Sequence, residues 1–285
     1  MPLGDVRGML AAARRRRRAV GSFNVFNLET IEAVLGAARV RRRPAIVAFT
    51  ERLAEDFDLE TLALVVRHRA AGLDVPIGLH LDHGQSEAGV LRALRAGFTS
   101  VMYDGAGIPY EEKVRRTRAI ADMAHGFSAA VEAELGHVPR GGRQGEVLAD
   151  PDLVADFVKR TGVDVVAVAI GSVHGLKAGE ARLDFNRLRA IRRETDAHLS
   201  LHGSSGIADA ELRRGIREGI TKISYFTAAS RAASLAMRAT WPAGRSVPPY
   251  AVLSVAARRA FQARIEERLV VYAGGRRQRK RTTQN

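Results

Sequence analysis

Hydrophobic and polar residues follow two patterns that succeed each other almost to the end of this chain. Short apolar runs rich in β-branched residues predict eight strands, at residues 21–25, 45–49, 77–81, 100–103, 128–133, 165–170, 199–202 and 222–225. Between these runs, apolar residues recur with helical spacing and predict helices at residues 28–39, 59–71, 87–96, 110–125, 151–160, 186–195 and 208–218. Gly72, Gly97, Gly162 and Gly219 stand near predicted helix ends, where glycine favours termination of a helix.

Eight strands, each followed by a helical segment, are typical of one architecture. They predict an α/β fold in which parallel strands close into a (β/α)8 TIM barrel, with extra C-terminal helices in residues 226–270. An open doubly wound sheet is the alternative, but such a sheet does not normally use eight successive units. No linker or composition shift interrupts residues 1–275, so we expect a single barrel domain followed by a basic, disordered tail at residues 276–285.

The 285-residue chain carries a formal net charge of +14 and contains no cysteine. Arginines supply most of this charge and are spread over the whole sequence, including a run from Arg14 to Arg18 that continues an alanine-rich helical stretch. We interpret the positive charge as a general compositional bias of the chain rather than as a recognition surface. Because no aromatic residues interleave the basic runs, we expect no specific nucleic-acid binding. Since no run reaches the roughly 18 apolar residues of a membrane span and no secretion signal is present, we expect a cytoplasmic protein without membrane contact.

Histidines stand at the ends of three apolar runs. Side chains of His83, His174 and His202 can converge on one metal ion, because strand ends of a barrel meet at the same face. Without cysteine, imidazole and carboxylate groups are the remaining protein ligands. Asp82 precedes His83, and consecutive residues of an extended backbone point to different sides, so one could bind metal while the other faces substrate. His80 lies one layer deeper and is expected to pack inside the barrel.

Two further patterns in the sequence can support chemistry. Glu132 and Glu134 lie on the same side of a predicted strand that is otherwise apolar. They are either exposed on a surface strand, or buried and compensated by a metal or a basic partner, which the apolar flanks favour. Glycine-rich turns at residues 171–175 and 202–206 follow two of the histidine runs, and their backbone N–H groups and serine hydroxyls could approach a phosphate. Ordinary tight turns would have a similar composition.

Several ordered segments resemble the class II, zinc-dependent fructose-bisphosphate and tagatose-bisphosphate aldolases. These segments are VGSFNVFNLE at 20–29, HLDHG at 80–84, AGFTSVMYDG at 96–105, VEAELG at 131–136, TGVDVVAVAIGSVHG at 161–175 and LHGSSG at 201–206. The resemblance extends from about residue 3 to residue 230. It implies a TIM-barrel lyase of carbohydrate metabolism and glycolysis, which cleaves a phosphorylated ketose reversibly to dihydroxyacetone phosphate and an aldehyde.

The resemblance also implies roles for individual residues. His83, His174 and His202 would bind the catalytic zinc, with Glu134 an alternate ligand when the metal moves. Asp82 would be the acid and base on the aldol hydroxyl. The substrate and phosphate positions would be Asn24, Thr50, Gly175, Lys177, Gly203, Ser205, Ser224 and Thr227. A homodimer or homotetramer is implied as well, whereas a second zinc site and a monovalent cation beside the phosphate are options that the sequence does not decide.

Three departures from the family pattern bear on activity and substrate. The loop after Glu134 is shorter and basic, and Glu146 is our candidate for the acid that exchanges the carbon-bound proton. Lys177 stands one position early, and the eighth strand has Ser224 and Thr227 in a segment where the family has asparagine and a polar pair. Two other interpretations therefore stay open: an aldolase for another phosphorylated keto-sugar acid, as in inositol breakdown, and a catalytically weak barrel that binds a sugar phosphate or a partner.

Overall fold

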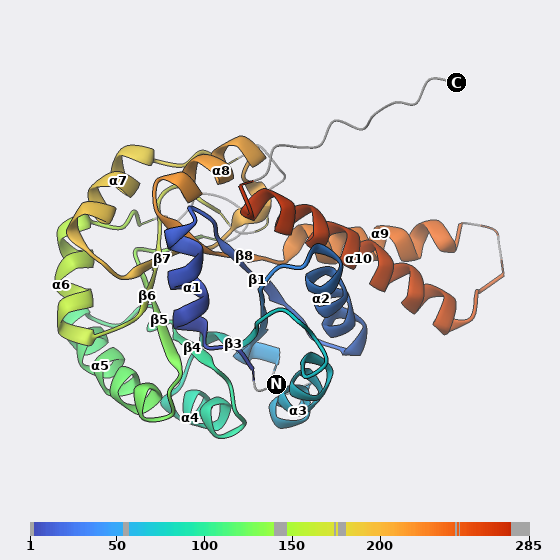
Figure 1. Ribbon diagram of the computed structural model, residues 1–285, viewed down its shortest axis with the longest axis horizontal. Helices are drawn as coiled ribbons and strands as arrows, with labels where there is room; N and C mark the ends of the chain where they lie inside the picture. Colours follow the sequence, from blue (N-terminus) through green and yellow to red (C-terminus); the bar gives the residue numbers. More distant parts are fainter. Residues whose placement is uncertain are drawn as a thin grey trace.

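The strands of the computed structural model close into a barrel in the order in which they occur along the chain (Figure 1). The structure describes residues 3–53, 57–139, 147–173, 175, 181–242, 244 and 246–274. Neighbouring strands are parallel throughout, and β8 pairs with β1 to complete the circle. The predicted (β/α)8 barrel is confirmed, and the open doubly wound sheet is excluded.

The observed elements overlap each predicted strand and helix, with bounds that differ by a few residues. The strands are β1 Val20–Asn24, β2 Ala45–Thr50, β3 Ile77–Gly84, β4 Ser100–Tyr103, β5 Ala130–Leu135, β6 Val165–Val168, β7 His198–Leu201 and β8 Ile220–Tyr225. The α-helices are α1 Val6–Arg15, α2 Leu28–Arg41, α3 Leu59–Ala70, α4 Glu87–Arg95, α5 Tyr110–Gly126, α6 Pro151–Thr161, α7 Phe185–Glu194, α8 Asp209–Arg217, α9 Thr227–Thr240 and α10 Tyr250–Tyr272. Two short 3-10 helices, η1 Glu51–Leu53 and η2 Ser204–Gly206, follow β2 and β7.

Helix α1 closes the N-terminal end of the barrel. Its side chains Val6, Met9 and Leu10 are buried in one cluster with Val20 and Ile46 from the starts of β1 and β2. Burial of these apolar groups fixes the helix across the strand starts. The barrel interior is therefore accessible from the carboxyl ends of the strands.

The arginine run that begins at Arg14 leaves the helix earlier than predicted. Helix α1 ends at Arg15, and Arg17 adopts a left-handed backbone with φ of 50°. Residues 16–18 therefore form the turn that leads into β1, contrary to the prediction that the run continues the helix.

Glycines end several helices as the sequence predicts. Gly162 is the left-handed C-cap of α6, with φ of 70°, and donates its N–H to the carbonyl of Val158 at 2.9 Å. Gly97 and Gly219 also have positive φ, whereas Gly72 does not. These turns bring the chain back to the next strand within a few residues.

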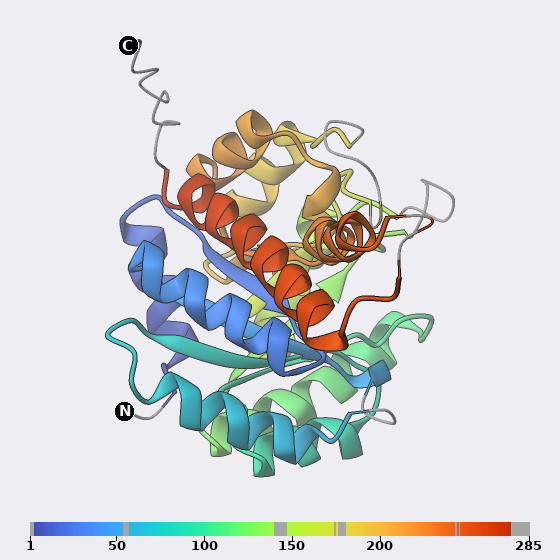
Figure 2. The same ribbon diagram turned by 90° about the vertical axis from the view of Figure 1, so that its right-hand side faces the viewer.

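The extra helices α9 and α10 form an arm that projects from one side of the barrel (Figures 1 and 2). Helix α10 packs against α2, where Ser254 Oγ donates a hydrogen bond to Glu29 Oε1 at 2.8 Å. Helix α9 packs on α10, and Ala229 is its buried residue. The predicted C-terminal helices are confirmed.

The expected tail at 276–285 lies outside the described residues. Among the helices that the structure describes, none is long and apolar enough to span a membrane.

Candidate active site

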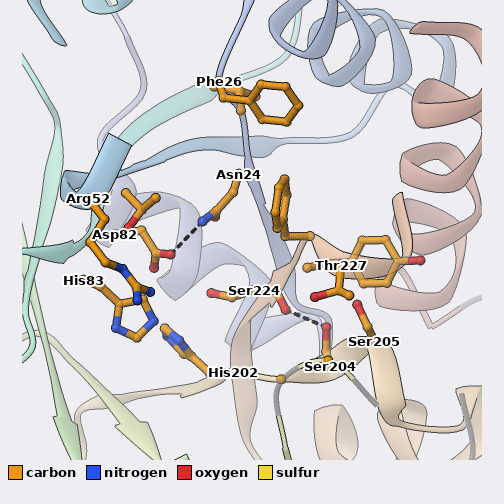
Figure 3. Close-up of a pocket in the computed structure, with 16 residues that line it drawn as sticks. Asn24, Phe26, Arg52, Asp82, His83, His202, Ser204, Ser205, Ser224 and Thr227 are labelled. Atoms are coloured by element: carbon orange, nitrogen blue, oxygen red, sulfur yellow. Dashed lines mark hydrogen bonds between the residues drawn. The ribbon is translucent and has the colours of Figure 1, made fainter. Parts of the chain in front are cut away.

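A cavity of about 270 Å³ opens at the carboxyl ends of the strands (Figure 3). Its lining includes residues that the sequence singled out: Asn24, Thr50, Asp82, His83, Gly175, His202, Gly203, Ser205, Ser224 and Thr227. They come from β1, β2, β3, β8, the segments after β6 and β7, and the start of α9, which lie far apart in the sequence. The barrel topology therefore places the predicted metal-binding, acid–base and phosphate-binding groups around one space. His174, Lys177 and Glu146 lie outside the described residues.

Three side chains form a possible metal-binding cluster at one end of this cavity. Ligand atoms of Asp82, His83 and His202 all lie within 4.8 Å of one another, and all three residues are buried. The rings of His83 and His202 meet edge to face, with centroids 5.1 Å apart. Two imidazoles and a carboxylate at this separation can share one cation.

Asp82 and His83 do not point to different sides as an extended backbone would require. His83 has φ of 53°, in the left-handed region that a non-glycine residue seldom adopts, and the register between β3 and β4 shifts at this point. The local twist turns both side chains toward the cavity. The predicted separation of their orientations is therefore wrong, and backbone strain at the end of β3 is the physical reason.

A carboxylate orients each histidine of the cluster. His83 Nδ1 lies 2.9 Å from Asp104 Oδ2 at the end of β4, and His202 Nε2 lies 2.9 Å from Glu132 Oε1 on β5. Such contacts fix the ring orientation and the tautomer of a metal-binding histidine. One ring nitrogen of each histidine is thus held by a carboxylate.

Beneath the cluster, the barrel interior contains a buried polar network. Lys222 Nζ donates to Glu132 Oε2 at 2.5 Å and also contacts His80 Nε2 at 3.1 Å. His80 Nδ1 lies 2.9 Å from Ser100 Oγ. All four side chains are almost fully buried. His80 therefore packs inside the barrel as predicted, and Lys222 is the basic partner that compensates Glu132.

Opposing effects set the ionisation of the carboxylates in this region. Burial alone would raise the pKa of Glu132, but Lys222 and His202 outweigh it and hold that pKa well below the usual range. Burial likewise opposes ionisation of Asp82, whose pKa is nevertheless lowered by His83, His202 and Lys222. Both groups are therefore carboxylates at neutral pH.

The pKa values of two histidines in this region shift in opposite directions. Burial disfavours the charged form of His83, but the carboxylates of Asp82 and Asp104 outweigh it and raise its pKa to about 9. Burial and the adjacent Lys222 lower the pKa of His80 to about 3. The His83 position consequently favours a cation, whereas His80 is a neutral hydrogen-bonding group.

Asp82 is held by a contact from the first strand. Asn24 Nδ2 donates to Asp82 Oδ2 at 2.8 Å (Figure 3). The other oxygen, Oδ1, is buried and accepts no hydrogen bond from the described residues. One carboxylate oxygen is thus fixed, and the other can interact with a ligand in the cavity.

The opposite end of the cavity is formed by the turn after β7 and the start of α9. Gly203 has φ of 64°, and the turn η2 that follows it is tied to β8 because Ser204 Oγ donates to the carbonyl of Ser224 at 2.5 Å. Ser205 Oγ accepts the N–H of Ala228 at 3.2 Å, in the first turn of α9. In Figure 3 Ser204, Ser205 and Thr227 lie on the side of the cavity across from His83. Backbone N–H groups at such a turn and at a helix start can bind phosphate.

Glu134 lies close to the cluster without lining the described cavity. It is buried on β5, its Oε1 lies 3.9 Å from His137 Nδ1, and its Oε2 accepts no hydrogen bond from the described residues. Burial raises the pKa of this carboxyl. The interpretation of Glu132 and Glu134 as exposed residues of a surface strand is therefore wrong, since both side chains are buried.

Sequence reasoning missed three residues of this region. Asp104 directly follows β4, and Asp82 lies near the end of β3, so its place beside a strand end was an available signal. Lys222 is a lysine within an apolar strand, which indicates a buried partner. Arg52 lines the cavity from η1, directly after β2, and no feature of its sequence context distinguishes it from the other arginines.

Comparison with known proteins places these features in a family context. Residues 4–274 match the family model described as fructose-bisphosphate aldolase class-II. The fructose-bisphosphate aldolase of Geobacillus stearothermophilus is 40% identical over 236 residues, covering 80% of this chain and 82% of that protein. A protein of Bacillus subtilis (strain 168) described as "Probable fructose-bisphosphate aldolase" is 37% identical over 249 residues, covering 84% of this chain and 87% of that protein. The crystal structure of the YdjI aldolase from Escherichia coli K12 superposes with a TM-score of 0.85 at 32% identity, covering 95% of this chain and 97% of that one.

Proposed function

Because the chain belongs to the class II fructose-bisphosphate aldolase family, a family of lyases, we propose that it is a zinc-dependent aldolase acting on a phosphorylated ketose of the fructose- or tagatose-bisphosphate type. The products are dihydroxyacetone phosphate and an aldehyde. The observation that carries the proposal is the convergence of Asp82, His83 and His202 within 4.8 Å at the carboxyl end of the barrel. The glycine- and serine-rich turn that lines the same cavity after β7 supports it.

The residues of the cluster fit a zinc ion. Imidazole nitrogens with carboxylate oxygens are ligands that zinc prefers, and His83 already lies where two carboxylates favour a cation. In this proposal His83 and His202 bind zinc together with His174, and Glu134 is the alternate ligand. A bound zinc ion supplies Lewis-acid stabilisation of the negative charge that develops when the bond beside a ketone breaks.

Asp82 is the proposed acid and base. Its Oδ2 is held by Asn24, and its Oδ1 is available to the hydroxyl group of the substrate. In cleavage the carboxylate takes the hydroxyl proton as the aldehyde forms, and in condensation it returns that proton. Glu146 is the proposed partner for the carbon-bound proton.

The phosphate group is proposed to bind at the turn between β7 and α9. Gly203 and Ser205 line the cavity there, and so does Thr227, the first residue of α9. Binding a remote phosphate fixes the orientation of the carbon atoms that react. The remaining proposed contacts come from Asn24, Thr50, Gly175, Lys177 and Ser224.

Ser224 motivates the alternative substrate. A serine is shorter than the asparagine of the family pattern, so the cavity has a different hydrogen-bonding group beside the reacting carbons. An aldolase for a phosphorylated keto-sugar acid is therefore the second candidate. A catalytically weak, ligand-binding barrel is the third, because the loop that contains Glu146 departs from the family pattern.

We also propose a cytoplasmic homo-oligomer. Leu235, Trp241, Tyr250 and Val252 are exposed on the α9–α10 arm, and an apolar surface of this kind is suited to pack against a second copy of the chain. Light scattering on the purified protein tests this proposal, and a monomer at micromolar concentration contradicts it.

A substrate panel tests the proposed function. Initial rates of dihydroxyacetone phosphate release are measured for fructose bisphosphate, tagatose bisphosphate and a phosphorylated keto-sugar acid of the inositol-breakdown type. The proposal expects turnover of one of the two bisphosphates. Turnover of the sugar acid alone would support the second candidate, and binding of all three without cleavage would support the third.

A further inference from the structure

Arginines from three separate segments meet at the end of the barrel opposite the active site. Residues 16–18 precede β1, Arg42 and Arg43 precede β2, and Arg213 and Arg217 lie in the helix that precedes β8. Because the strands are parallel, these segments lie at the strand starts, whereas the catalytic cavity lies at the strand ends. We call the set Arg16, Arg17, Arg18, Arg42, Arg43, Arg213 and Arg217 the basic face.

The basic face is hollowed. One concavity of about 290 Å³ is lined by Arg16, Arg17, Arg18, Arg213 and Arg217, together with three small or apolar residues near the ends of α8 and α10. An adjoining concavity of about 220 Å³ shares Arg16 and Arg18 and adds Arg42 and Arg43. Neither lining contains a carboxylate or an aromatic side chain. The ends of α1, α8 and α10 that form the first concavity lie close together in Figure 1.

Most arginines of the basic face form no ion pair with a carboxylate that the structure describes. Arg213 reaches Asp209 at 3.9 Å, and the other six arginines form no ion pair with a described carboxylate. By contrast, Arg14 and Arg41 in the same segments pair with Asp196 and Glu266, at 3.1 and 2.9 Å. Asp209, which pairs with Arg213, is thus the one described carboxylate within ion-pair distance of the basic face.

Local backbone geometry also favours residues other than arginine at two of these positions. Arg17 and Arg42 have φ of 50° and 51°, in the left-handed region where glycine is least strained. Burial and the nearby guanidinium groups of Arg18 and Arg16 lower the pKa of Arg43. Like charges thus lie close together on strained turns, an arrangement that an anion bound among them would stabilise.

We propose that the basic face binds a linear polyphosphate group. Planar guanidinium groups donate paired hydrogen bonds to phosphate oxygens, and several of them around one hollow match several phosphates in a row. The absence of aromatic residues from both linings leaves no side chain for stacking a base. The ligand is therefore recognised by its phosphate chain, whether that chain belongs to inorganic polyphosphate or to a nucleoside polyphosphate.

Calorimetric titration of the full-length protein with sodium tripolyphosphate tests this site. The double variant Arg17→Ser/Arg217→Ser removes a pair of exposed guanidinium groups from the basic face. The double variant Arg115→Ser/Arg118→Ser removes a pair from α5 and is the control with the same change in charge. We expect affinity to fall about tenfold or more in the first pair and to be unchanged in the second. Aldol cleavage, at the opposite end of the barrel, is expected to be unchanged in both. Equal affinities in the two pairs would overturn the proposal.

Two further titrations distinguish the source of binding. Adenosine triphosphate is expected to bind as tightly as tripolyphosphate, because the phosphate chain alone is recognised. A single-stranded oligonucleotide of the same total charge is expected to bind more weakly, and tighter binding would overturn the proposal in favour of a nucleic-acid surface. Removal of residues 276–285 is expected to preserve binding, and loss of binding on truncation would assign the anion to the basic tail instead.

Discussion

Glu132 Oε2 and Lys222 Nζ lie 2.5 Å apart in the interior of the barrel, with neither side chain exposed to solvent. Through its other oxygen, Glu132 contacts His202 at the cavity. The pair therefore links the packing of β5 and β8 to the orientation of a proposed metal ligand. Removing one partner leaves a buried charge without compensation, which costs far more than removing both.

Lys222→Met is expected to lower the free energy of unfolding by about 3–5 kcal/mol, because the carboxylate of Glu132 stays buried without its cation. The double variant Glu132→Gln/Lys222→Met is expected to recover most of this loss. Urea denaturation measures both, with Lys159→Met at an exposed position of α6 as the control. If the single and double variants were equally destabilised, the ion pair would not be the cause.

Asp82→Asn is expected to reduce kcat by about 10²–10⁴-fold, because the amide cannot take up the hydroxyl proton. The zinc content of the protein is expected to stay the same. Stopped assays of dihydroxyacetone phosphate release and elemental analysis measure the two quantities, and Asp122→Asn, exposed on α5, is the control. Unchanged activity in the Asp82 variant would favour a barrel that binds ligands without acid–base catalysis at this residue.

Gly203→Ala is expected to raise KM for the phosphorylated substrate by about 10- to 100-fold. A Cβ at Gly203 would lie 2.8 Å from the backbone carbon of Val173, so the anion-binding turn must move. Gly162→Ala is the matched control, since that glycine has a similar φ of 70° but no atom within 4 Å of an added Cβ. The control is expected to lose about 1 kcal/mol of stability and to retain its KM. An equal KM in both variants would contradict phosphate binding at this turn.

His198 is expected to make the protein less stable as the pH falls. Burial, together with Arg14 and Arg192, lowers the pKa of this histidine from 6.5 to about 4 in the folded state. The unfolded chain therefore binds a proton first, and stability declines as the pH falls from about 6.5 to about 4. His198→Asn is expected to flatten this part of the pH–stability curve, measured by thermal unfolding, whereas His68→Asn at an exposed position of α3 is the control. An unchanged slope in the His198 variant would show that other groups cause the decline.

The fold could be predicted from the sequence because the same pattern recurs along the chain. An apolar run is followed by apolar residues at helical spacing, and glycines stand near several of the helix ends. The approach of His83 and His202 also followed, since closure of a parallel barrel brings strand ends together whatever their separation in sequence. The joint orientation of Asp82 and His83 could not be predicted, because it depends on a left-handed residue and a register shift at the end of β3. Local propensity gives no signal for such strain.

Long-range pairs were also beyond prediction. Lys222 and Glu132 are 90 positions apart, and their contact depends on which side chains share a layer of the closed barrel. The basic face has the same origin: the run at residues 14–18 was visible, but its meeting with Arg43 and Arg213 arises only when the strand starts come together. Charge that is dispersed along the sequence is thus concentrated by the topology.

Metal removal and restoration test the central claim most directly. The protein is stripped with a chelator, dialysed, assayed for cleavage of the bisphosphate that it turns over fastest, and assayed again after one equivalent of zinc is added. Zinc-dependent cleavage at His83 and His202 predicts loss of activity on stripping and its return on zinc addition, with no return in His202→Ala. Full cleavage by protein that elemental analysis shows to be free of metal would contradict the account.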